Sequence, residues 1–259
     1  MGGREKQGVF MKKAGIFLLL FFIPLAAMAG PPYLTDDPDP VAAGAWELYG
    51  FYQFTNYTPE AVGSLPGLEV NYGLLGWMQL HLIVPAAFYA DDSGYKHMGP
   101  GDTETGIKIR FIDQSGAIPM IGTFPHIEIP TGDSARGLGT GDVRVFLPLW
   151  LQMTWVNFMT YGGGGYWIET GRDRLNSAYL GWVLRLKIIP GVIAGLEINY
   201  STAQVKGGSP MNGADVGLDI ALSENSRLLL SYGTSITGDE TYFGYIGYRM
   251  TFGQGQEEF

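Results

Sequence analysis

A strict alternation runs through residues 105–111, which read Thr-Gly-Ile-Lys-Ile-Arg-Phe. The two isoleucines and Phe111 fall on one face of this stretch, whereas Lys108 and Arg110 fall on the other. A period of two is typical of a β-strand with one apolar and one polar face. A soluble sheet buries its apolar face in a core. An outer-membrane barrel turns that face to lipid and points the polar face into a lumen.

The same alternation recurs in about twelve segments, and each is close to the roughly 9–11 residues that a tilted strand needs to cross a bilayer. The predicted strands are 45–56, 67–75, 78–89, 102–113, 119–130, 141–152, 157–168, 177–189, 192–203, 213–222, 227–237 and 242–252. The glycine run 162–165 makes the seventh of these the weakest, since glycine inside a strand weakens it.

The lengths of the connections separate by parity. Those after odd-numbered strands are mostly long, for example 57–66 and 90–101, whereas those after even-numbered strands are short, for example 76–77 and 190–191. Bacterial outer-membrane barrels combine an even number of strands with short periplasmic turns and longer outer loops. We therefore predict an all-β fold, a transmembrane antiparallel up-and-down β-barrel of about 12 strands over residues 45–252.

The N-terminus predicts export. Four basic residues precede an apolar run at 16–27, and a small-x-small cleavage site ends at Ala29. This is the pattern of a secretory signal peptide, and the run is too short for a transmembrane helix. We predict a signal peptide at 1–29, starting at either Met1 or Met11. The chain has no cysteine, so neither lipoprotein anchoring nor a disulfide is expected.

The charge excludes one class of partner. Removing residues 1–29 takes away four basic and one acidic residue, which changes the formal net charge from −9 to −12. An acidic exported protein is a poor partner for nucleic acid. The 39 glycines and 14% aromatic residues fit a membrane barrel, but they also fit a glycine-rich soluble β protein.

The two ends of the predicted barrel carry their own signals. Residues 30–44 are rich in proline and aspartate, and we expect a periplasmic N-terminal segment that is extended or plugs the barrel. The run at 35–40 lacks the regular oxygen spacing of a calcium loop. The last predicted strand has alternating aromatic residues that include Tyr248 and end at Phe252, which predicts an assembly signal. Residues 253–259 then form a predicted periplasmic tail.

Several stretches together resemble one family. They are PPYLTDDP at 31–38, WELY at 46–49, PGLEVNYG at 66–73, QLHLIVP at 79–85, GDTETGIK at 101–108 and EIPTGD at 128–133. They resemble the outer-membrane β-barrel family of transporters named for the phenol meta-cleavage degradation pathway. The resemblance implies a barrel and an outer-membrane location, and it brings no catalytic motif.

The polar faces of the predicted strands give the candidate site. The side chains that we expect along a solute path are Lys108, Arg110, His126, Glu128, Asp142, Arg144, Trp150, Arg185 and Lys187. Basic groups beside aromatic rings would suit an aromatic carboxylate or phenolate. In the alternative interpretation, these charges pair with acidic neighbours across strands and simply fill the barrel.

Other chemistries find less support. His81 and His126 with Glu128 could suggest a metal or acid–base site, but two histidines without cysteine are few ligands for a metal ion. An outer-membrane lipase would need serine and histidine together, and the serines Ser201 and Ser231 fall on distant strands.

The predicted function is an outer-membrane channel or transporter for small solutes, among them hydrophobic or aromatic compounds, in a Gram-negative cell. An enzyme acting on lipid and a non-transporting structural barrel stay open as alternatives. We expect no cofactor and no catalytic residue. The expected partners are outer-membrane lipids, the barrel assembly machinery and a small-molecule solute.

Overall fold

The computed structural model describes residues 30–172, 174–238 and 242–253. The predicted signal peptide and residues 254–259 of the predicted tail lie outside these ranges. The strands are β1 Trp46–Asn56, β2 Glu60–Leu75, β3 Met78–Asp91, β4 Lys96–Pro100, β5 Thr103–Ile112, β6 Met120–Thr123, β7 His126–Ile129, β8 Arg144–Thr154, β9 Phe158–Glu169, β10 Ser177–Ile189, β11 Val192–Ser201, β12 Met211–Ser223, β13 Ser226–Thr237 and β14 Tyr242–Phe252. A 3-10 turn, η1, spans Ser134–Arg136. Among the described residues, no helix is long and apolar enough to cross a membrane.

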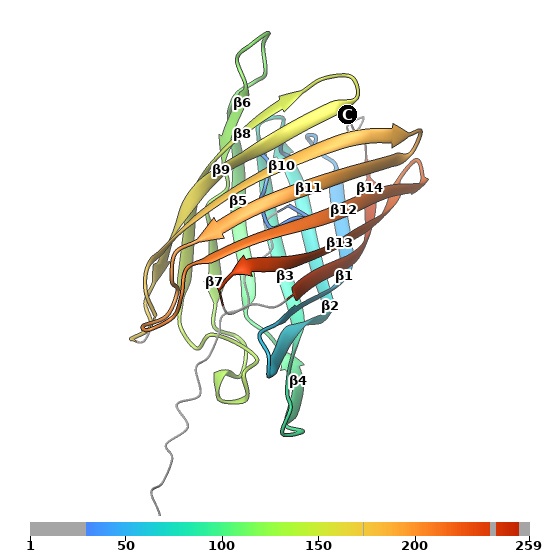
Figure 1. Ribbon diagram of the computed structural model, residues 1–259. Helices are drawn as coiled ribbons and strands as arrows, with labels where there is room; N and C mark the ends of the chain where they lie inside the picture. Colours follow the sequence, from blue (N-terminus) through green and yellow to red (C-terminus); the bar gives the residue numbers. More distant parts are fainter. Residues whose placement is uncertain (1–29, 173, 239–241, 254–259) are drawn as a thin grey trace, which may run out of the picture.

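These strands form one closed antiparallel barrel (Figure 1). β4 and β5 both pair with β3, and β6 and β7 both pair with β5 and β8, so each of these two pairs makes one interrupted span. The fourteen strands thus give twelve spans, as predicted. β1 pairs with β14 from Trp46 opposite Phe252 to Asn56 opposite Tyr242, which closes the sheet. The break between β6 and β7 falls at Pro125, which has no N–H for the ladder.

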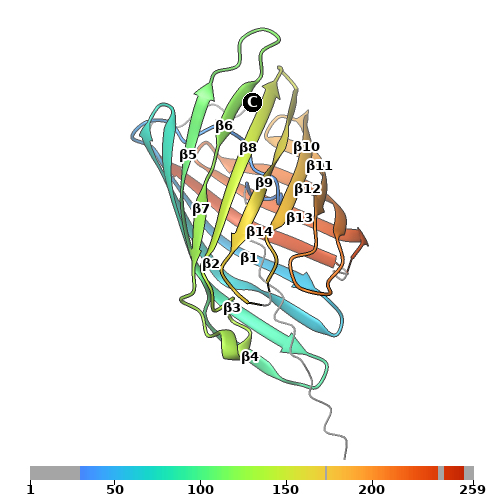
Figure 2. The same ribbon diagram turned by 90° about the vertical axis from the view of Figure 1, so that its left-hand side faces the viewer.

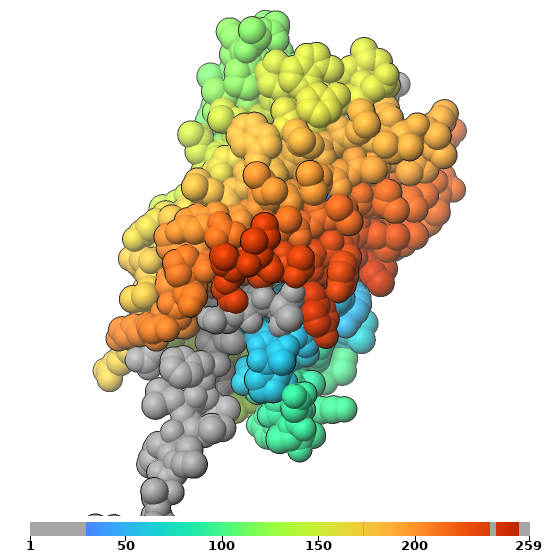
Figure 3. Space-filling view, in the orientation of Figure 1, coloured from blue at the N-terminus to red at the C-terminus, as the bar shows by residue number. Residues whose placement is uncertain are grey.

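The two faces of the wall differ as the alternation predicts. On β8, Leu147 and Leu149 point outward and are 49% and 52% exposed, whereas Phe146 and Trp150 point inward and are buried. Large apolar side chains cover the outside in the same way on the other spans. In the space-filling view, β8 to β13 form a continuous outer wall (Figure 3). A sheet with this exterior is suited to lipid and not to water.

Two strands differ from the expectation, and one of them is β4 at Lys96–Pro100, which lies within the predicted connection 90–101. β2 begins at Glu60, so most of the predicted long connection 57–66 is strand, with a register shift between Ser64 and Gly67. The glycine run in β9 does not break that strand. An ideal Cβ on Gly165 would lie 2.3 Å from the ring of Phe146, so the inward ring occupies the space that a side chain would need.

The ends of the barrel are unlike each other (Figure 2). At one end, here called the short-turn end, lie the tight turns and the two partners Trp46 and Phe252. At the other, the long-loop end, the connection between β7 and β8 forms a loop that lies beside β4. Leu138 of this connection is buried against Val62, Ala87 and Tyr89, which lie on the inner side of β2 and β3. The connection between β7 and β8 therefore narrows the opening of the lumen at the long-loop end.

Candidate functional site

Residues 30–44 are here called the plug, and most of this segment runs inside the barrel. The N–H of Val41 donates to Gln79 Oε1 at 2.9 Å, and Ser231 Oγ donates to the carbonyl of Pro32 at 2.6 Å. The ring of Tyr33 is buried with Tyr161 and Val183 of β9 and β10. The sequence left an extended and a plugging segment open, and these contacts place residues 32–41 within the lumen. The compartment that each end of the barrel faces stays a prediction.

The wall is shaped to receive the plug. Ideal Cβ atoms on Gly181 and Gly195 would lie 1.8 Å from Thr35 Oγ1 and 2.1 Å from the Tyr33 hydroxyl oxygen. On Gly217, a Cβ would again meet the Tyr33 ring and hydroxyl, at 2.7 to 2.8 Å. Any side chain at these inward positions of β10, β11 and β12 would therefore collide with the plug.

A single carboxylate holds the centre of the plug. Glu197 of β11 is fully buried and accepts the N–H groups of Leu34 at 2.8 Å and of Thr35 at 2.7 Å. Thr35 Oγ1 donates to Glu197 Oε1 at 2.5 Å, and the Tyr179 hydroxyl donates to the same oxygen at 3.2 Å. Hydrogen bonds to an ionised acceptor are stronger than neutral ones, so Glu197 is a strong anchor for this segment.

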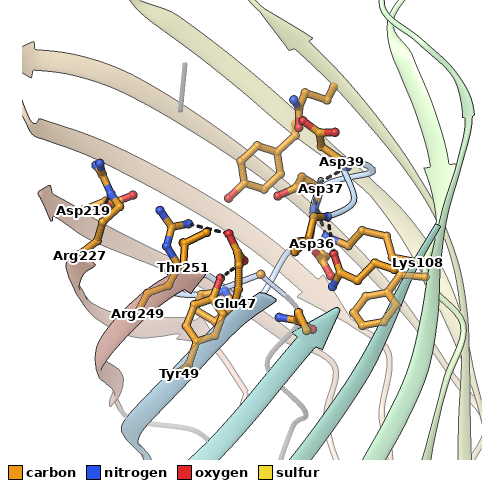
Figure 4. Close-up of a pocket in the computed structure, with 18 of the residues that line it drawn as sticks. Asp36, Asp37, Asp39, Glu47, Tyr49, Lys108, Asp219, Arg227, Arg249 and Thr251 are labelled. Carbon is orange, nitrogen blue, oxygen red and sulfur yellow. Dashed lines mark hydrogen bonds and ion pairs between the residues drawn. The ribbon is translucent and has the colours of Figure 1, made fainter. Parts of the chain in front are cut away.

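The two cations of β5 hold the acidic part of the plug, and Figure 4 shows one of them, Lys108, beside Asp36 and Asp37. Lys108 Nζ lies 2.9 Å from Asp36 Oδ1 and 3.2 Å from Asp37 Oδ1, and Arg110 Nη1 lies 2.5 Å from Asp39 Oδ1. Burial raises the pKa of Asp36, and the Lys108 ammonium opposes that shift. Both predicted path residues thus point into the lumen, where they bind this chain's own carboxylates.

A second group of predicted residues forms a buried network toward the long-loop end. The Arg144 guanidinium lies between Glu128, at 2.9 Å, and Glu169, at 2.8 Å, and it stacks 4.2 Å from the ring of Trp167. Arg144 is 1% exposed. A guanidinium held between two carboxylates has little charge to offer a solute, which favours the filling interpretation at this position.

Aromatic rings pack beside that network. His126 lies 5.2 to 5.3 Å, ring centre to ring centre, from Phe124, Phe146 and Trp167. Trp150 belongs to the same buried cluster. The other lumen histidine, His81, contacts Asn71 Oδ1 at 2.6 Å and Glu104 Oε1 at 3.0 Å. Among the described residues, no group of three or more histidine, aspartate or glutamate side chains is arranged so that it could hold a metal ion.

The remaining predicted residues are dispersed. Arg185 Nη2 of β10 lies 2.7 Å from Asp219, which Arg227 also contacts. Lys187 is exposed and lines a small hollow of about 490 Å³ near the turn between β10 and β11. Asp142 lies before β8, in the connection at the long-loop end. The structure therefore brings Lys108, His126, Glu128, Arg144 and Trp150 to one side of the lumen but separates Asp142 and Lys187 from them.

A cavity of about 720 Å³ lies between the plug and the wall (Figure 4). On the plug side it is lined by Asp36, Asp37 and Asp39. Across from them it is lined by Glu47, Tyr49, Asp219, Arg185, Arg227 and Arg249, and its apolar surface comes from Met120, Phe124, Met159 and Tyr161. Thr154, Asn225 and Thr251 also line it, so the cavity reaches the short-turn end.

The sequence did not single out Glu197, and it left open whether residues 30–44 plug the barrel. Glu197 has the polar-face register of β11, but nothing local distinguishes it from other inward carboxylates. One signal in the sequence was charge complementarity between the N-terminal segment and a strand. Three aspartates lie in 36–39, and the strand that carries Lys108 and Arg110 has the opposite charge on its polar face.

The comparisons with solved structures concern the fold. The chain is similar to the COG4313 outer membrane channel from Pseudomonas putida F1, with a TM-score of 0.70 and 16% identity over 83% of this chain and 98% of that one. It is also similar to the KdgM porin in complex with disordered oligogalacturonate, with a TM-score of 0.54, 9% identity and coverage of 81% and 99%. The chain is similar to the NanC porin as well, with a TM-score of 0.53 and 8% identity over 79% of this chain and 98% of that one. The sequence matches no protein family and no curated protein.

These likenesses are to outer-membrane channels and porins. The closed barrel and its apolar exterior place the protein in the outer membrane, and the likenesses agree with this fold. The outer-membrane address expected from the sequence is thereby confirmed. The predicted link to phenol degradation finds no support at this level of identity and stays an expectation.

Proposed function

We propose that the protein is an outer-membrane channel for small solutes, including hydrophobic and aromatic compounds. The observation that carries this proposal is the cavity of about 720 Å³ beside a non-covalently held plug. Ligand pockets are typically about 300–1,000 Å³, so a single-ring compound fits this space. Met120, Met159 and Phe124 offer it apolar contact, and a shift of the plug would extend the path along the lumen.

The charges suggest how such a channel treats ions. The lining holds seven carboxylate side chains and four cationic ones, counted over Asp36, Asp37, Asp39, Glu47, Glu69, Asp219 and Glu224 against Lys108, Arg185, Arg227 and Arg249. Charges in a low-dielectric channel raise the local concentration of the opposite sign. We therefore expect a preference for cations, in contrast to the anion path suggested by the basic residues of the sequence.

Two measurements test the proposal. Liposomes that contain the mature protein are assayed for swelling with aromatic acids, neutral aromatics and sugars, and lipid hydrolysis is assayed in parallel. Solute entry without hydrolysis supports a channel, whereas hydrolysis without entry supports the enzyme alternative. If neither solute entry nor lipid hydrolysis is detected, the protein is a structural barrel.

Reversal potentials in a salt gradient test the charge argument. The variant Arg110→Gln/Arg144→Gln/Arg185→Gln removes three positive lumen charges and is expected to strengthen the cation preference of the wild type. An anion-selective wild type that loses its selectivity in the triple variant would instead support the basic strip as the solute path.

A further inference from the structure

Gly30 is the first residue of the mature chain if cleavage follows Ala29, and it lies inside the barrel. It lines the cavity between the plug and the wall, and its carbonyl accepts the N–H of Tyr33 at 3.0 Å in a turn. This turn brings the start of the plug back onto residue 36. An ideal Cβ on Gly30 would lie 2.9 Å from Asp36 Oδ1 and 3.3 Å from the Asp36 Cα.

The backbone nitrogen of Gly30 shares its Cα with that ideal Cβ. Two substituents on one tetrahedral carbon are about 2.5 Å apart, so the nitrogen lies within about 5.4 Å of Asp36 Oδ1. A positive charge within about 4–6 Å of a carboxylate interacts strongly with it. The mature N-terminus is therefore in ion-pair reach of Asp36 without moving the plug.

The positive charge beside Asp36 is shared with a second carboxylate, so a second cation would stabilise Asp36. Asp36 is 2% exposed, and its Oδ1 receives Lys108 Nζ at 2.9 Å and the N–H of Asp37 at 2.7 Å. Lys108 also contacts Asp37, so one ammonium serves two carboxylates. Burial of an incompletely compensated charge is costly. The raised pKa of Asp36, in spite of Lys108, agrees with this shortage of positive charge.

We propose that removal of the signal peptide creates an α-ammonium on Gly30 that pairs with Asp36 and thereby completes the seating of the plug. Hydrolysis of the Ala29–Gly30 peptide bond consumes one water and leaves a carboxylate on Ala29 and an ammonium on Gly30. An α-amino group has a pKa near 8 and is mostly charged at pH 7. In the uncleaved chain the same nitrogen is a neutral amide, so maturation supplies the charge. The inference rests on the predicted cleavage and not on solute transport.

The test is a double-mutant cycle on refolded barrels. One chain begins at Gly30, and the other carries two additional alanines before Gly30, which move the ammonium by up to about 7 Å. Each is combined with wild-type Asp36, Asp36→Asn or, as the matched control, Asp39→Asn, whose carboxylate binds Arg110. Since the chain has no native cysteine, Leu34→Cys gives each variant a single thiol in the plug. The labelling rate of this thiol by a charged maleimide reports release of the plug, and heat-modifiable migration verifies folding.

The added alanines should accelerate labelling about tenfold with wild-type Asp36. This is the change expected if loss of a partly buried ion pair raises the ratio of released to seated plug about tenfold. They should have the same effect with Asp39→Asn and no effect with Asp36→Asn. Equal acceleration in all three backgrounds, or none with wild-type Asp36, would overturn the inference. So would a mass of the mature protein that places its first residue elsewhere than Gly30. Because labelling does not depend on conductance, a non-conducting barrel would refute the proposed function alone.

Discussion

Replacing Glu197 by glutamine should release the plug without unfolding the barrel. The glutamine has nearly the same shape, but it carries no charge, and its amide nitrogen donates where one carboxylate oxygen accepted. The carboxylate now accepts the N–H groups of Leu34 and Thr35 and the hydroxyl of Thr35. At least one of these three donors would then face another donor.

The size of the effect follows from these contacts. A hydrogen bond to a charged group contributes about 1.5–3 kcal/mol, and a buried donor left without an acceptor costs a similar amount. We expect Glu197→Gln to destabilise the seated plug by about 3 kcal/mol, which corresponds to a rise of about 100-fold in the ratio of released to seated plug. The strand ladders on both sides of Glu197 use backbone groups alone, so the barrel should still close.

Planar-bilayer recordings measure this ratio as the fraction of time spent in the larger conductance state. Glu69→Gln is the matched control, since Glu69 is also a buried inward carboxylate but bonds to Asn71. The reasoning is refuted if Glu197→Gln folds with unchanged openings, or if Glu69→Gln increases them equally.

Three further outcomes are expected. Phe252→Ala should reduce membrane insertion more than deletion of residues 253–259, as scored by heat-modifiable migration, and the reverse order would move the assembly signal to the tail. Gly195→Val should raise conductance because its side chain collides with Tyr33, and unchanged conductance in a folded variant would contradict that contact. Arg144→Met should lower the free energy of unfolding by about 3–5 kcal/mol because it removes the cation that the buried Glu128 carboxylate contacts, and urea titration in detergent should detect that loss.

The sequence alone predicts the barrel because the information is local. In a strand that separates lipid from lumen, apolar and polar side chains must alternate with a period of two. This pattern can be read from the residues of each strand alone. The limits of β10 and β14 agree with the prediction at both ends. Departures occur where neighbours in space matter, as in β2, which continues into a predicted loop through pairing with β3.

The candidate site depends on pairings that no local pattern contains. The register of β5 shows that Lys108 and Arg110 face the lumen, but it does not show what they meet there. Their partners lie 71 to 72 positions earlier in the chain, and Glu197 meets Thr35 across 162 positions. A charge in a closed lumen binds the nearest group of opposite sign, and only barrel closure decides which group that is. Tertiary structure thus placed the chain's own N-terminal segment against Lys108 and Arg110, two of the residues that the sequence predicts along a solute path.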